Sequence, residues 1–136
     1  MAASISGTIR VMEIISDEIF QDLINKAFES LPAIHRDRVQ NVAILFADVP
    51  TPEQRHELAL RHDQTLLGLY QGIPLSARQG RPALLPDRIT LFKLPLLAQA
   101  TNLQELQEAI RHTLWHEIAH YYGLNHDDIG RLEGQR

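Results

Sequence analysis

Apolar residues recur at helical spacing in an early stretch of the chain, about residues 17–31. Ser16 or Asp17 can cap the start of a helix here, and Pro32 ends it. This pattern predicts an amphipathic helix whose apolar stripe faces the core. The stripe consists of Ile19, Phe20, Leu23, Ile24, Ala27, Phe28 and Leu31.

A second apolar stripe predicts a longer helix from a cap at Asn102 to about Tyr122. Glu105 stands three residues after the cap, as in a capping box. Gly123 can adopt the left-handed conformation that ends a helix. The predicted buried positions are Leu103, Leu106, Ile110, Leu114, Ile118 and Tyr121.

Two stretches between these helices have the composition of strands. Residues 39–49 are almost continuously apolar and end at Pro50, which predicts a buried strand. Residues 88–93 alternate and are rich in β-branched and aromatic side chains, which predicts a second strand. Thr51 can cap a short helix, with Pro52 at its first position and Gln54 three residues after the cap, as in a capping box. We expect this helix to end near His62.

Residues 71–86 are irregular because glycine and proline recur along them. A loop this long is often functional, so one interpretation is that it borders a substrate cleft. An ordinary surface excursion is the alternative. The order of elements predicts an α+β fold, with a small mixed sheet packed against the C-terminal and N-terminal helices. Residues 1–136 fit one domain, with residues 1–11 as a flexible N-terminal extension.

Composition narrows the classes of partner and the compartment. The formal net charge of −4 argues against a nucleic-acid partner. No apolar run is long enough to cross a membrane, and residues 1–10 do not resemble a secretory signal. The chain has no cysteine, which is compatible with a reducing compartment. We therefore expect a cytoplasmic protein without a membrane partner.

The most informative chemistry is the motif H-E-x-x-H-x-x-G-x-x-H, which begins at His116. On a helix, His116 and His120 lie one turn apart on the same face, where both imidazoles can bind one zinc ion. Glu117 can then reach a water in the open coordination position and act as general base. After the turn at Gly123, His126 can return as the third ligand. The sequence therefore predicts one zinc ion on three histidines.

Several features of this site stay open. Asp127 and Asp128 directly follow His126, and either one is an alternative third ligand. A purely structural zinc is disfavoured because such sites usually have four ligands and often cysteine. His112 lies one turn before His116, too far along the helix to join the same ion, so we expect it at the cleft wall or surface. Manganese, iron or cobalt could also occupy three imidazoles.

Beyond this motif, residues 31–32, 41–43, 67–75, 85–92 and 111–120 carry a resemblance to a known family. In these residues the chain resembles the small bacterial zincin-like metallopeptidases, the minimal-zincin family. The resemblance implies an α+β zincin core with a zinc site and a peptide or protein substrate. It also suggests that residues 88–93 form an edge strand along which an extended substrate binds. An interior strand is the alternative.

The predicted function is zinc-dependent peptide-bond hydrolysis with Glu117 as general base. One departure is that no methionine follows His126, whereas the related metzincins have a methionine-containing turn there. A non-catalytic zincin-fold binding domain is therefore one alternative. A metal-dependent endoribonuclease is another, because such enzymes share the spacing of His116, His120 and His126. Glu117 and the acidic net charge disfavour it.

Overall fold

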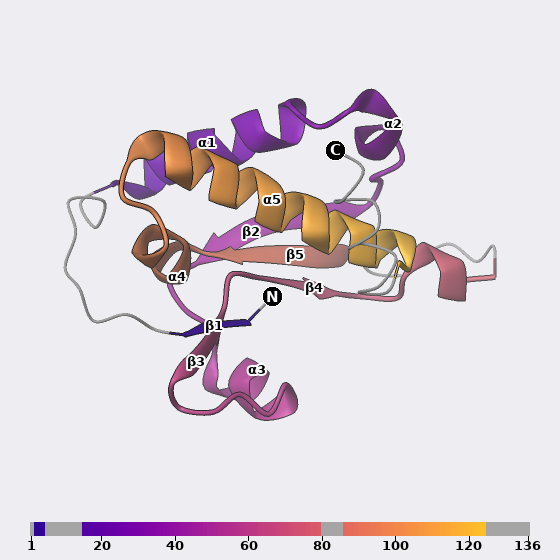
Figure 1. Ribbon diagram of the computed structural model, residues 1–136. Helices are drawn as coiled ribbons and strands as arrows, with labels where there is room; N and C mark the ends of the chain where they lie inside the picture. The colour runs from indigo at the N-terminus through magenta and orange to yellow at the C-terminus, as the bar shows by residue number, and fades with distance from the viewer. Residues whose placement is uncertain (1, 5–14, 80–85, 125–136) are drawn as a thin grey trace.

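Figure 1 shows the computed structural model of the chain, which describes residues 2–4, 15–79 and 86–124. Helices and short strands are interspersed along the chain, and the longest element is the helix α5. The elements are β1 (Ala2–Ser4), α1 (Asp17–Glu29), α2 (Ala33–Arg36), β2 (Val42–Ala47), α3 (Pro52–Glu57), β3 (Gln64–Leu66), β4 (Gly68–Gln71), the 3-10 turn η2 (Leu75–Ala77), β5 (Asp87–Phe92), α4 (Lys93–Ala98) and α5 (Leu103–Tyr122).

The main sheet has three strands in the order β2-β5-β4. Strands β2 and β5 are parallel, with Ile44 opposite Ile89. Strands β4 and β5 are antiparallel, with Tyr70 opposite Ile89. A separate antiparallel pair joins β1 to β3. The predicted α+β class with a small mixed sheet is confirmed.

Helices α1 and α5 cover the same face of this sheet, and Figure 1 shows α5 crossing it. Side chains alternate along a strand, so Ile44 of β2 shares this face with Ile89 and Leu91 of β5. These residues belong to the core together with Phe20 of α1. The opposite face carries exposed side chains, including Leu45. The fold is therefore a two-layer arrangement that holds α5 firmly against the sheet.

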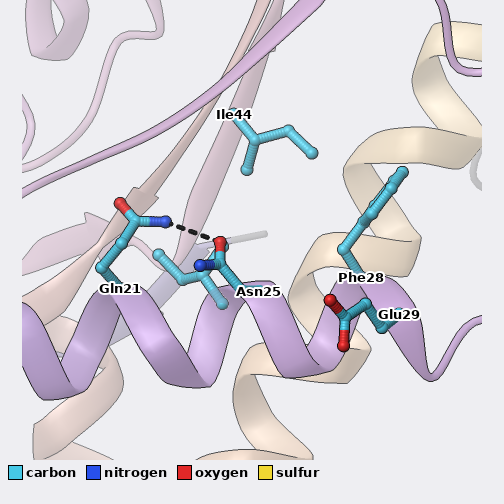
Figure 2. A pocket seen from close by; sticks show the side chains of 6 residues that line it. Gln21, Asn25, Phe28, Glu29 and Ile44 are labelled. Atoms are coloured by element: carbon cyan, nitrogen blue, oxygen red, sulfur yellow. Dashed lines mark hydrogen bonds between the residues drawn. The ribbon is translucent and has the colours of Figure 1, made fainter.

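Helix α1 follows the prediction in its bounds and its cap. The Ser16 hydroxyl accepts a hydrogen bond from the backbone N–H of Ile19 at 3.2 Å. The buried stripe is narrower than predicted, because the side chain of Ile19 is exposed. A shallow hollow separates α1 from β2 (Figure 2), and the Gln21 amide donates to Asn25 beside it at 3.0 Å.

Helix α5 also begins and ends where the sequence predicted. The Asn102 side chain accepts a hydrogen bond from the backbone N–H of Glu105 at 2.8 Å. Gly123 ends the helix with φ of 92°, in the left-handed region. Leu103 is an exception to the predicted stripe, because it lies in the first turn and is exposed. The predicted capping box of the short helix α3 is present at Thr51, but the helix ends at Glu57 rather than near His62.

The strands correct two predictions. The predicted buried strand 39–49 is the shorter β2, which lies at an edge of the sheet and is only partly buried. The prediction that residues 88–93 form an edge strand is wrong. This segment is β5 with the first residue of α4, and β5 is the central strand. Its near-continuous burial fits a strand paired on both sides.

The edge strand on the side of the candidate site is β4, which was not predicted as a strand from the sequence. Strand β3 and helix α4 were also not predicted. Each of these segments is short: three, four and six residues for β3, β4 and α4.

Among the described residues, no helix is long and apolar enough to span a bilayer.

Candidate active site

Helix α5 brings His116, Glu117 and His120 together. The ring centroids of the two histidines lie 4.9 Å apart. Each of the three side chains offers a ligand atom, and these atoms lie within 4.8 Å of one another. Tetrahedral zinc binds imidazole nitrogens at about 2.0–2.1 Å, so two nitrogens at this spacing can share one ion after small side-chain rotations. The predicted clustering of these residues is therefore present.

Glu117 lies beneath strand β4 and is almost fully buried, with 3% of its surface exposed. One carboxylate oxygen, Oε1, accepts a hydrogen bond from the backbone N–H of Tyr70 at 3.1 Å. The other, Oε2, has no hydrogen-bond partner among the described residues. Burial raises the pKa of Glu117 from 4.5 to about 7, and the Tyr70 bond opposes this rise. A carboxyl group with this pKa can exchange a proton near neutral pH.

Strand β4 passes close to Glu117 because it contains Gly68. A Cβ atom at this position would lie 2.7 Å from Thr113 Cγ2 and 3.2 Å from Glu117 Cγ, both on α5. A side chain would therefore push the strand away from the helix. Glycine in a strand often marks such a close approach of another element, and Gly68 is the first residue of β4. Gly68 thus sets the spacing that lets the Tyr70 N–H reach Glu117.

One edge of β4 is open, and the hydrogen-bond register shows which groups face it. The Phe92 N–H donates to the Leu67 carbonyl at 2.9 Å, so Leu67 forms a hydrogen-bonded pair with β5. Such pairs alternate along antiparallel strands. The backbone groups of Gly68 and Tyr70 therefore point away from β5, and the Tyr70 N–H is the one that binds Glu117. No other strand pairs with this edge in the part of the chain that the structure describes.

A buried polar cluster fixes Tyr70 and the segment that follows β4. The Tyr70 hydroxyl donates to Asp87 Oδ2 at 2.6 Å, and the Arg78 guanidinium forms an ion pair with the same carboxylate. Burial and the Asp87 hydrogen bond raise the pKa of Tyr70. The Arg78 guanidinium also lies 5.6 Å from the centre of the Tyr121 ring on α5. The cluster therefore ties the segment after β4 to the end of α5 that carries His120.

Comparison with protein families identifies the arrangement. The sequence model described as zincin-like metallopeptidase matches residues 39–136, well over half of the chain. The chain belongs to the zincin-like metallopeptidase family. The match includes every strand of the main sheet and the whole of α5, and it leaves α1 outside. A search of curated proteins found no match.

Zinc is the cofactor that membership of the zincin-like family implies, and the described residues fit it. His116 and His120 supply the nitrogen ligands that zinc prefers. The unpartnered Oε2 of Glu117 lies among these groups, where a polar ligand would satisfy it. The predicted third ligand His126 and its alternatives Asp127 and Asp128 lie outside the described residues.

The remaining predicted positions can be placed directly. His112 is exposed, and its ring centre lies 6.5 Å from that of His116, which agrees with a place at the cleft wall or surface. Pro74 of the irregular segment lines the hollow beside Glu117, so this part of the segment borders the site. The contributions of Tyr70 and Asp87 were not predicted from the sequence. The one available signal was Gly68, a glycine between apolar residues that marks a close approach.

Proposed function

We propose that the chain is a zinc-dependent peptidase. His116 and His120 bind the ion, with His126 as third ligand, and Glu117 is the general base. The observation that carries this proposal is the position of Glu117, a buried carboxylate with one free oxygen that lies between two zinc-ligating histidines and an open strand edge. A buried ionised carboxylate destabilises the folded chain, and such groups are typical of functional sites.

The chemistry divides between the ion and the protein. When bound, zinc supplies a Lewis acid that polarises the peptide carbonyl and makes a bound water more acidic. Glu117 accepts the proton of the attacking water and then delivers it to the leaving nitrogen. The Tyr70 N–H fixes Oε1 and leaves Oε2 to move the proton.

The substrate is a peptide segment that binds in extended form along β4. The outward carbonyls of Gly68 and Tyr70 and the outward N–H of Gly68 can pair with a peptide backbone, whatever its side chains. Strand β4 thus takes the place of residues 88–93, which were expected from the sequence to bind the substrate. The peptide would then lie directly over Glu117, because Gly68 brings β4 close to that side chain.

Peptide hydrolysis by the zinc-loaded full chain tests the proposal. The variant Glu117→Gln keeps the shape of the side chain and removes the base, so we expect turnover to fall by about 10²–10⁴-fold. Glu108→Gln is a matched control, because Glu108 is an exposed residue of the same helix. It should retain wild-type turnover. Zinc-loaded Glu117→Gln protein that is as active as wild type would contradict the assigned base.

A cytoplasmic location is part of the proposal and rests on the sequence alone, with which the lack of cysteine is compatible. Cell fractionation with an antibody to the chain tests it. Recovery with cytoplasmic markers is expected, and recovery in an exported fraction would contradict it.

A further inference from the structure

One helical turn before Glu117, helix α5 carries a threonine, Thr113, whose side chain is completely buried at 0% exposure. Its hydroxyl oxygen, Oγ1, makes no hydrogen bond within the part of the chain that the structure describes. A threonine inside a helix ordinarily faces solvent or donates to the backbone carbonyl four residues before it. Thr113 does neither, so its hydroxyl has a hydrogen-bonding capacity that the fold leaves unused.

The Oε2 atom of Glu117 is in the same situation. It is buried, and it too lacks a hydrogen-bond partner among the described residues. A buried polar atom without a partner destabilises a protein, so two of them in one place call for an explanation. Residues four apart on a helix are neighbours on one face, and Thr113 and Glu117 therefore lie side by side.

Strand β4 shows that the two side chains meet at one point. A Cβ atom at Gly68 would lie 2.7 Å from Thr113 Cγ2 and 3.2 Å from Glu117 Cγ. Both side chains thus pack against the same residue of β4, which covers them. The hydroxyl and the carboxylate share this covered space, where each is the nearest kind of partner that the other can use.

We propose that Thr113 is a positioning residue for the general base, and that its hydroxyl donates a hydrogen bond to Oε2 of Glu117. The proposal rests on the proposed peptidase function and adds a residue to its machinery. The Tyr70 N–H holds Oε1, and the Thr113 hydroxyl holds Oε2, so the carboxylate is fixed at both oxygens. A carboxylate oxygen can accept two hydrogen bonds, which leaves Oε2 one place for the attacking water.

A hydroxyl suits this position because it both donates and accepts, and its hydrogen can rotate. It donates to Oε2 while Glu117 is ionised. Once Glu117 has taken the proton of the water, the same hydroxyl can turn and accept a hydrogen bond. The Tyr70 N–H can only donate, so the two partners of Glu117 have different roles.

The variants Thr113→Val and Thr113→Ser separate this role from packing. Valine keeps the shape of threonine without the hydroxyl, whereas serine keeps the hydroxyl without the methyl group. The substrate is the peptide that the zinc-loaded full chain cleaves fastest in a mixed synthetic library. We expect Thr113→Val to lower kcat about tenfold or more at unchanged KM, and Thr113→Ser to recover most of the loss.

The matched control is Thr90→Val. Thr90 lies on β5 between Ile89 and Leu91, two core residues, so its side chain points to the sheet face away from α5. Its replacement removes a hydroxyl from the same chain at a distance from the base. Thr90→Val should retain the kcat of wild type.

A double-mutant cycle tests the contact without relying on activity. Urea denaturation of the metal-free full chain at pH 8 is measured for wild type, Thr113→Val, Glu117→Gln and the double variant. Hydrogen bonds to an ionised acceptor are about twice as strong as neutral ones. Thr113→Val should therefore lower the denaturation midpoint about half as much in the Glu117→Gln background as in wild type. This coupling in a protein that cleaves no peptide would keep the contact and reject the peptidase function.

Four results would overturn the proposal. Thr113→Val protein with the kcat of wild type would show that the hydroxyl does not serve the base. Thr113→Ser protein as impaired as Thr113→Val would assign the effect to packing of the methyl group. Equal changes of midpoint in the two backgrounds would show that the hydroxyl does not contact Glu117. Loss of zinc from Thr113→Val, measured by elemental analysis, would place the hydroxyl at a metal ligand instead.

Discussion

Replacing Glu117 by glutamine should stabilise the metal-free protein at pH 8. The side chain is 3% exposed, and its pKa in the folded chain is about 7 against 4.5 for the ordinary group. One pKa unit corresponds to about 1.4 kcal/mol, so keeping the carboxylate ionised in the folded state costs about 3 kcal/mol. Glutamine has the same shape and never ionises, which removes this cost.

The sign of the pH dependence follows from proton binding. Between pH 4.5 and about pH 7 the folded protein holds the Glu117 proton while the unfolded chain has released it. The wild-type free energy of unfolding therefore falls as pH rises through this window, and the full cost remains above it. The advantage of Glu117→Gln should be small near pH 4.5, grow through the window and level off at about 3 kcal/mol near pH 8.

Urea denaturation in the presence of a chelator measures this difference at several pH values from 5 to 8. Wild type and Glu117→Gln differ only at this side chain, so the difference between the two curves reports the loss of the Glu117 carboxyl group. Glu108→Gln, on an exposed site of the same helix, should follow the wild-type curve. Wild-type and Glu117→Gln curves that stay parallel across the whole range would refute the reasoning, because they would show that Glu117 ionises without cost.

Three further variants test the structure around the site, each by chemical denaturation. Gly68→Ala should lower the free energy of unfolding by about 1–3 kcal/mol, because the added Cβ would lie 2.7 Å from Thr113 Cγ2. A Gly68→Ala variant as stable as wild type would show that β4 is not close to α5. Asp87→Asn should cost about 3–5 kcal/mol by leaving the Arg78 guanidinium, whose side chain is 11% exposed, without its ion pair. An unchanged midpoint there would contradict the buried cluster. Asn102→Ala should cost about 1 kcal/mol through loss of the helix cap and Asn102→Ser should recover it, whereas equal stability of all three would argue against the cap.

The sequence was most informative where local rules dominate. Ser16, Thr51 and Asn102 each cap a helix as predicted, because a cap depends only on the next few residues. The spacing of His116 and His120 fixed their shared face for the same reason, since four residues make about one helical turn. These local regularities were enough to predict both long helices and the clustering at the candidate site.

The sequence was least informative where pairing between distant segments decides the structure. Residues 88–93 alternate like an edge strand, yet β5 pairs with β2 on one side and β4 on the other. The order of strands depends on the whole sheet, and the alternation within one strand does not reveal it. The hydrogen bond from the Tyr70 N–H to Glu117 joins residues 47 positions apart and depends on that same pairing. Neither could be read from a local pattern.

The zinc content of the chain tests the central claim most directly. The full chain is purified without a chelator or a histidine tag, and elemental mass spectrometry is applied to wild type, His120→Ala and Glu117→Gln. We predict about one zinc per chain in wild type and Glu117→Gln, and loss of zinc in His120→Ala. Wild-type protein that holds no metal after zinc is added back, or His120→Ala protein that keeps its zinc, would contradict the assigned metal site.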